Sequence, residues 1–262
     1  MRITVSCLGI DAGTAKAALE LAGRVSGRLE GEKGKLVRDY FALKDGSLVL
    51  VLLTHDTAVG KGVEALAKEI ASASKTKAPM AEIEFEERPG ESITLASCAK
   101  AGEVQFNRII YQIFSSPAST PGLALDPKMR GGFKFEIRDG SGDERTVLDV
   151  PAEAFDLYAL IGFEGGYAVG KVYSATGEEA ACASCPGSGI LVSRGGKGFP
   201  GMEEVLAAFK QSNVKAKCAV FSVGNGILAE VKQSAGRDDS GMRRQALEEV
   251  KAKFRNRFIP NV

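Results

Sequence analysis

The chain has 262 residues and a formal net charge of +1, with 34 basic and 33 acidic side chains. This length can bury a substantial core and is near the upper size of a single domain, so we expect one domain over residues 1–262. The charge balance indicates no nucleic-acid partner, and no apolar run approaches the ~20 residues of a membrane span. Residues 1–10 are typical of a first strand, because Asp11 follows them and a small-residue cleavage site does not.

The cysteine and histidine counts narrow the chemistry. The five cysteines are scattered and odd in number, which argues against a disulfide framework and favours a reducing cytoplasm. Cys182 and Cys185 form a CxxC pair in a strand-rich stretch, where we expect packing or turn cysteines rather than a zinc or redox pair. His55 is the one histidine, and its place at a strand end favours a structural role.

Periodicity predicts most of the secondary structure. In chain order we expect strand 2–10, helix 15–29, strands 36–43 and 47–54, helix 61–73, strands 81–87 and 91–98, helix 103–115, strands 133–139 and 144–149, helix 152–161, strands 167–173, 179–184 and 189–193, helix 201–211, strands 217–223 and 226–231, and helix 240–256. Thr14 is a plausible N-cap, and Asp45-Gly46 is a hairpin signal. Hairpins outnumber crossovers, which predicts an α+β fold with mostly antiparallel sheets and helices on their outer faces.

One segment, residues 107–139, carries a long specific phrase. Its characteristic residues are Asn107, Tyr111, Thr120-Pro121-Gly122-Leu123, Asp126-Pro127, Met129, Gly132-Phe133, Phe135 and Glu136. The phrase resembles that of the archaeal-type (class V) fructose-1,6-bisphosphate aldolase/phosphatase family. The resemblance implies a layered α-β-β-α sandwich, a homo-oligomer, and a phosphorylated sugar or triose as substrate.

A glycine-rich stretch, Ser193 to Gly201, precedes the helix predicted at 201–211. Backbone N–H groups at a helix start bind anions, and glycines let a phosphate approach closely. An ordinary glycine-rich turn with two solvated bases explains the same residues. Both interpretations stay open on the residues alone.

The resemblance assigns roles within this stretch. The family carries a Tyr-x-x-Lys-Asp-Asp-Pro segment here, whose lysine forms a Schiff base with dihydroxyacetone phosphate. Lys197 matches that lysine and Arg194 stands in place of the tyrosine, while the two aspartates are absent. We therefore expect Lys197 and Arg194 as catalytic residues, and a substrate-binding loop made of Gly195, Gly196, Lys197 and Gly198.

The resemblance also implies magnesium ligands, most of which this chain lacks. Asp11 matches a ligand at the end of the first strand, and Asp45 falls near an Asp-Asp hairpin of the family. Ala18 replaces a histidine ligand, and Ala99 stands where the family has aspartate before lysine. Magnesium needs several oxygen ligands around each ion, so two isolated carboxylates do not support a multi-metal phosphatase site.

Schiff-base aldol chemistry is affected less by these losses, because its iminium is the electron sink in place of a metal. Arg194, three positions from Lys197, would favour the neutral amine if both face one cleft, and Tyr111, Tyr167 or Tyr173 could transfer the proton. We therefore predict a sugar-phosphate enzyme with aldol chemistry, its Asp11 and Lys197 facing a common pocket. The alternative is a paralogue that lost catalysis and serves as a binding or structural protein.

Overall fold

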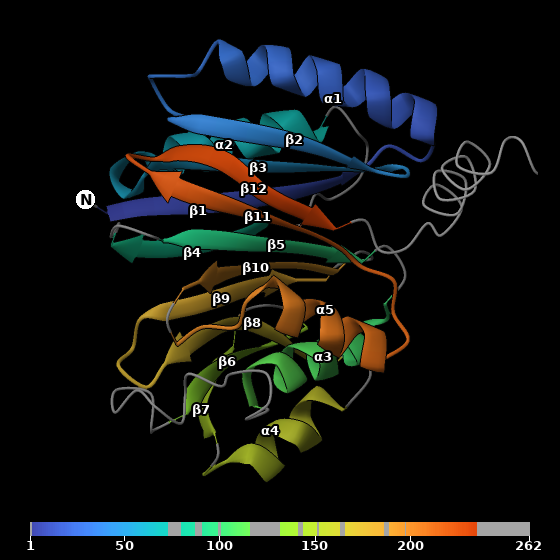
Figure 1. The fold of residues 1–262 in the computed structure, drawn as a ribbon, viewed down its shortest axis with the longest axis vertical. Helices are drawn as coiled ribbons and strands as arrows, with labels where there is room; N and C mark the ends of the chain where they lie inside the picture. The colour runs from blue at the N-terminus through green and yellow to red at the C-terminus, as the bar shows by residue number, and fades with distance from the viewer. Residues whose placement is uncertain are drawn as a thin grey trace, which may run out of the picture.

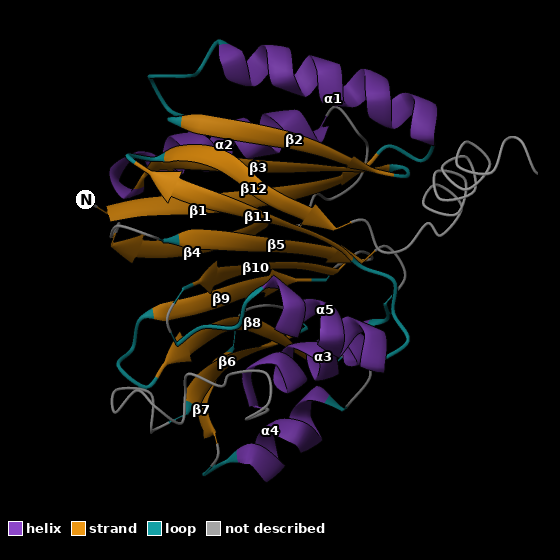
Figure 2. Ribbon diagram, viewed as in Figure 1, coloured by secondary structure: helices purple, strands orange, loops and turns teal. Residues whose placement is uncertain are grey.

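The computed structural model describes residues 2–72, 80–86, 91–98, 101–115, 132–140, 144–150, 152–162, 166–185, 189–196 and 198–234. These residues form two mostly antiparallel sheets, of four and eight strands, with helices on their outer faces (Figures 1 and 2). The α+β sandwich that the sequence predicts is therefore confirmed. The predicted helix 240–256 and residues 116–131 of the family-like phrase lie outside the described residues.

The smaller sheet has the strand order β2-β3-β1-β4. Its strands are β1 (Arg2–Asp11), β2 (Asp39–Asp45), β3 (Leu48–Asp56) and β4 (Met80–Glu86). β1 and β3 are nearly continuous apolar runs because both of their faces are covered. Val5 and Cys7 face the second sheet, whereas Leu8 and Ile10 face the helices. β4 alternates buried and half-buried residues, as its glutamates predict.

The larger sheet has the order β12-β11-β5-β10-β9-β8-β6-β7. Its strands are β5 (Ser92–Cys98), β6 (Phe133–Asp139), β7 (Arg145–Val150), β8 (Tyr167–Ser174), β9 (Glu179–Ser184), β10 (Gly189–Gly195), β11 (Lys217–Gly224) and β12 (Ile227–Ser234). The hairpins expected about residues 140–142 and 224–226 are both present.

Helices complete the outer layers. They are α1 (Ala15–Glu30), the short 3-10 helix η1 (Thr57–Val59), α2 (Gly60–Ser72), α3 (Glu103–Ser115), α4 (Ala154–Ile161) and α5 (Met202–Gln211). α1 and α2 pack on the four-stranded sheet, and α3, α4 and α5 pack on the eight-stranded sheet. Thr14 caps α1 as predicted, since its hydroxyl accepts from the backbone N–H of Ala17. No described helix is long and apolar enough to cross a membrane.

Three layers of apolar packing hold the elements together. One layer lies between the two sheets, and one lies between each sheet and its helices. Phe41 and Phe221 join the sheets, with ring centroids 5.1 Å apart. Thr54 of β3 also donates a hydrogen bond to the backbone oxygen of Gly226, beside β12. These contacts hold β2 and β3 against β11 and the turn before β12.

The first strand of the β2–β3 hairpin begins three residues later than the predicted start at residue 36. The backbone N–H groups of Lys35, Leu36 and Val37 all donate to the carbonyl of Glu32, which forms a turn after α1. Backbone groups engaged in that turn are not available to the strand ladder. Gly46 has φ +62°, a conformation that favours glycine and that ends β2 at Asp45.

Candidate functional site

The described structure brings the two candidate metal ligands to one edge of the sandwich. Asp11 is the last residue of β1 and Asp45 the last of β2, and both are in register with Leu48 of β3. Residues paired across neighbouring strands share a face, and two strand spacings place the two aspartate Cα atoms about 10 Å apart. Leu48 packs between the sheets, so its register partners Asp11 and Asp45 are on the face of the sheet that is turned toward the eight-stranded sheet.

Two residues of that sheet meet Asp45. Lys217 of β11 places its Nζ 2.8 Å from Asp45 Oδ1, and the Ser97 hydroxyl of β5 donates to Asp45 Oδ2 at 3.4 Å. Lys217 and Ser97 are themselves register partners. Asp11 accepts a hydrogen bond from the backbone N–H of Gly13 at 2.9 Å. We call Asp11, Asp45, Ser97 and Lys217 the Asp45 edge.

The Asp45 edge does not fit a magnesium cluster. Within the described ranges, no three His, Cys, Asp or Glu side chains are grouped so that they could hold a metal ion. Both carboxylate oxygens of Asp45 already have donors, one of which is the ammonium of Lys217. A divalent cation would have to displace that ammonium, so we derive no chemical step through magnesium.

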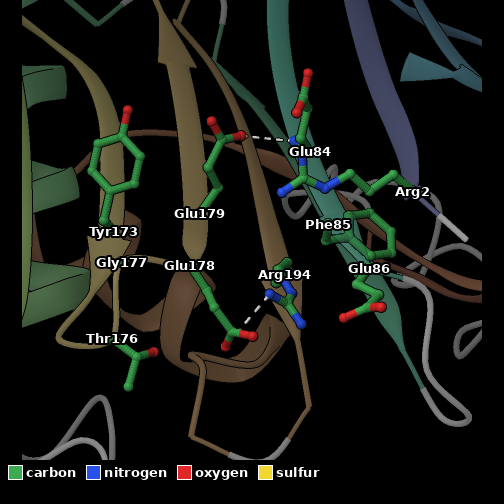
Figure 3. A pocket seen from close by; sticks show the side chains of 10 residues that line it. All are labelled: Arg2, Glu84, Phe85, Glu86, Tyr173, Thr176, Gly177, Glu178, Glu179 and Arg194. Carbon is green, nitrogen blue, oxygen red and sulfur yellow. Dashed lines mark hydrogen bonds and ion pairs between the residues drawn. The ribbon is translucent and has the colours of Figure 1, made fainter. Parts of the chain in front are cut away.

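Arg194, the predicted catalytic arginine, lies in β10 and lines a cavity of about 350 Å³ (Figure 3). Its side chain is only 3% exposed. Its Nη2 donates to Glu91 at 2.6 Å, and its Nε donates to the other oxygen of Glu91 at 3.4 Å. The guanidinium also lies over the rings of Phe85 and Phe199, 5.4 and 4.8 Å from their centroids. These contacts anchor the end of β10.

The cavity beside Arg194 carries more acid than base. Its charged lining consists of four glutamates and two arginines: Glu84, Glu86, Glu178, Glu179, Arg2 and Arg194. Glu178 approaches the guanidinium to 3.9 Å (Figure 3). Glu179 pairs with Lys171. A surplus of carboxylates disfavours a phosphorylated ligand at this cavity by like-charge repulsion.

The predicted substrate loop follows Arg194, and Lys197 itself lies outside the described residues. Gly195 pairs with Ser92, and Gly196 and Gly198 have φ of +124° and +89°. Positive φ is a conformation that side-chain-bearing residues rarely adopt, so the backbone path accounts for these glycines without a phosphate.

The Asp45 edge and Arg194 lie at opposite ends of β5. Arg194 is in register with Ile93, near the start of β5, whereas Asp45 contacts Ser97, near its end. Four strand residues separate these positions by about 13 Å. The described structure therefore brings Asp11 and Asp45 together, but it does not bring them together with Arg194.

Of the three candidate tyrosines, Tyr173 lines the Arg194 cavity. Its hydroxyl donates to Glu136 at 2.8 Å, and Arg138 donates to the other oxygen of Glu136. Burial raises the pKa of Tyr173, and the bond to Glu136 adds to that shift. Burial alone would raise the pKa of Glu136, but the hydrogen bonds from Tyr173 and Arg138 outweigh burial and hold the pKa below its ordinary value.

The other two tyrosines have packing roles on the helix side of the eight-stranded sheet. Tyr111 lies between Phe135 and Tyr158, with ring centroids 6.1 and 5.9 Å away. Tyr167 is half-buried against the same apolar layer. Their positions offer no link to Arg194 or to the Asp45 edge.

The cysteines and His55 have structural surroundings, as the sequence indicates. Cys182 packs between the sheets and Cys185, just after β9, packs against the helix layer, so the two thiols of the CxxC pair lie in different apolar layers. Buried His55 contacts the Ser6 hydroxyl through Nε2 at 3.0 Å and the backbone oxygen of Asp56 through Nδ1 at 2.9 Å.

Sequence reasoning missed Lys217 and the role of Ser97. Lys217 opens a strand in an ordinary polar stretch, Asn213 to Lys217, and no motif marks it. Its pairing with Asp45 arises only when β11 is placed beside β5 and opposite β2. The one sequence signal that could have pointed to Lys217 is that it is a charged residue at the first position of a strand, with an apolar residue on either side of it.

The chain is similar in sequence to several proteins that share one name. A fructose-1,6-bisphosphate aldolase/phosphatase of Ignicoccus hospitalis is 36% identical over 141 residues, which cover 49% of this chain and 36% of that protein. The protein of the same name from Methanocaldococcus jannaschii is 34% identical over 164 residues, covering 57% of this chain and 42% of its own length. That from Pyrobaculum neutrophilum is 29% identical over 255 residues, covering 80% and 64%.

The chain thus spans between about a third and two thirds of the length of these relatives. The family model described as fructose-1,6-bisphosphatase matches residues 60–222. That match includes β4 to β10 and most of β11, and with them Ser97, Lys217 and Arg194. Since more than half of the residues are matched, the chain belongs to the fructose-1,6-bisphosphatase family.

Proposed function

We propose that this chain is a sugar-phosphate enzyme that retains aldol chemistry through a lysine Schiff base rather than metal-dependent phosphate release. The family match over residues 60–222 supports the substrate class, since the names of the relatives concern fructose 1,6-bisphosphate. The observation that carries the choice of chemistry is the Lys217–Asp45 pair, which occupies a candidate metal ligand with an ammonium.

Schiff-base chemistry needs no metal at any step. A neutral lysine amine adds to the carbonyl carbon of dihydroxyacetone phosphate, and loss of water gives an iminium. The iminium withdraws the electron pair released when the neighbouring C–H bond is broken, and a base on the protein takes the proton. Lys197 remains the lysine that the family resemblance nominates.

Borohydride trapping tests this proposal on the intact chain. Borohydride delivers hydride to an iminium and leaves the substrate carbons attached to the lysine as a secondary amine. We expect dihydroxyacetone phosphate plus borohydride to add mass at Lys197 and not in Lys197→Ala. An adduct at another lysine would contradict the assignment of Lys197, and an unmodified chain would contradict aldol chemistry.

A second candidate function is sugar-phosphate binding without catalysis. It is favoured by the place of Arg194, which lies about 13 Å along β5 from the Asp45 edge, so that the described candidate groups do not converge. This candidate is supported if calorimetry shows that fructose 1,6-bisphosphate binds, while borohydride traps no adduct and no turnover is measured. Binding together with an adduct rejects it.

We also propose a homo-oligomer in a reducing cytoplasm. The resemblance supplies the first expectation, and the five cysteines, all free thiols, accord with the second. Light scattering coupled to size-exclusion chromatography measures the mass in solution. A monomer at all concentrations would reject the oligomer.

A further inference from the structure

We propose that the ammonium of Lys217 takes the place of a divalent cation on Asp45, so that the Asp45 edge binds the phosphate of a phosphorylated ligand without a resident metal. This inference rests on the proposed substrate class, but it requires no Schiff base. It follows from the geometry and charge of the edge.

The first argument is geometric. Lys217 Nζ lies 2.8 Å from Asp45 Oδ1, and its side chain is 39% exposed. An ammonium has three N–H donors, and Asp45 is the acceptor that the described residues supply to it. The remaining donors are available to an anion approaching from solvent, and a lysine binds phosphate in this way as a point charge.

The second argument is the sign of the local charge. A water-sized cavity of about 20 Å³ lies at the edge, and its lining contains Lys44 and Lys217 against the single carboxylate Asp45. The Arg194 cavity has the opposite balance, four glutamates against two arginines. With Asp11 counted, the edge has two ammonium groups against two carboxylates, so it repels a phosphorylated ligand less than the larger cavity does.

The third argument concerns competition with a metal. Asp45 is held from both sides, by Lys217 on Oδ1 and by the Ser97 hydroxyl on Oδ2. The register puts Asp11 about 10 Å away between Cα atoms, with Leu48 between them. A divalent cation at Asp45 would face the Lys217 ammonium, and two cations at contact distance repel one another strongly.

A metal titration tests the displacement directly. Mn²⁺ binding to the intact chain, followed by electron paramagnetic resonance, should be the same in the wild type and in Asp45→Asn. Lys217→Met should gain about tenfold in Mn²⁺ affinity, because the repelling ammonium is gone. The double variant Lys217→Met/Asp45→Asn should lose that gain. Wild-type Mn²⁺ binding that depends on Asp45, or no gain in Lys217→Met, overturns the proposal.

A ligand titration tests the phosphate contact. Fructose 1,6-bisphosphate should bind the wild type equally well in EDTA and in Mg²⁺, as measured by calorimetry. Lys217→Met should weaken binding about tenfold or more, the usual worth of a charge-assisted hydrogen bond, and Lys217→Arg should keep it within a few-fold. Lys232→Met is the matched control, because this lysine lies on β12 and pairs with Glu203.

The outcomes separate this inference from the proposed function. Wild-type binding that requires Mg²⁺, or unchanged binding in Lys217→Met, overturns the role of Lys217. A borohydride adduct on Lys217 also overturns it, because the residue would then be the nucleophile. If no sugar phosphate binds the wild type with or without Mg²⁺, the proposed function and the phosphate contact both fail, and the Mn²⁺ titration still decides whether Lys217 excludes the metal.

Discussion

The buried ion pair between Arg194 and Glu91 allows one substitution to distinguish an anchor from a catalytic group. Arg194→Met removes the guanidinium and leaves the Glu91 carboxylate, 10% exposed, without its bidentate partner. Removing one partner of a buried pair costs about 3–5 kcal/mol. We take about 3 kcal/mol, because Glu91 is next to the start of β5. For a domain of this size that corresponds to a fall in Tm of about 6–12 °C.

Thermal unfolding followed by circular dichroism measures this effect. Lys232→Met is again a suitable control, since its partner Glu203 has an 82% exposed side chain and a surface pair contributes little. Adding Glu91→Gln to Arg194→Met should recover part of the loss, because the unpaired buried charge is gone. If Arg194→Met melts within about 2 °C of the wild type, the anchoring argument is wrong and a role for Arg194 in ligand binding is favoured instead.

Three further predictions follow from burial and packing. Because the pKa of Glu136 is lowered in the folded chain, the stabilisation from its carboxylate is present above the ordinary pKa of 4.5 and is lost as pH falls through the folded pKa. The urea concentration at the unfolding midpoint should therefore fall as the pH is lowered from about 5 to about 3, and it should fall less steeply in Glu136→Gln. Equal slopes in the two proteins would contradict this. Burial raises the pKa of the Cys185 thiol to about 12, so a thiol reagent at about pH 8 should label Cys185 slowly in the native chain but should label all cysteines in the urea-unfolded chain. Rapid labelling of native Cys185 would refute this prediction. A Cβ at Gly189 would lie 2.6 Å from Cys98 Sγ, so Gly189→Ala should lower the free energy of unfolding, measured with a chemical denaturant, by about 1–3 kcal/mol. Gly23→Ala, on the exposed face of α1, should raise it by up to about 1 kcal/mol. An unchanged free energy of unfolding in Gly189→Ala would show that the neighbouring side chains move to accept the methyl group.

Much of the fold could be predicted because local pattern and burial agree. Helix 103–115 and strands 133–139 and 179–184 match their predicted bounds, and Thr14 caps α1 as expected. The later start of β2 could not be predicted, since it depends on three backbone donors that converge on the carbonyl of Glu32. Strand propensity says nothing about such competition.

The site was predicted less completely. Asp11 and Asp45 were identified by resemblance, and the structure places them in one cross-strand row. Lys197 was expected to share a pocket with Asp11, and Arg194 to share a cleft with Lys197, but β10 runs antiparallel to β5 and carries Arg194 to the end of β5 away from Asp45. Lys217 was not expected at all.

The sequence by itself determined the elements, the antiparallel α+β class and the family, because these depend on periodicity and on motifs within short segments. Only the tertiary structure decided which charges share an end of the sandwich. Strand order and direction fix those neighbours, and they are set by how apolar faces pack between the layers rather than by any residue near Asp45, Lys217 or Arg194 in the chain.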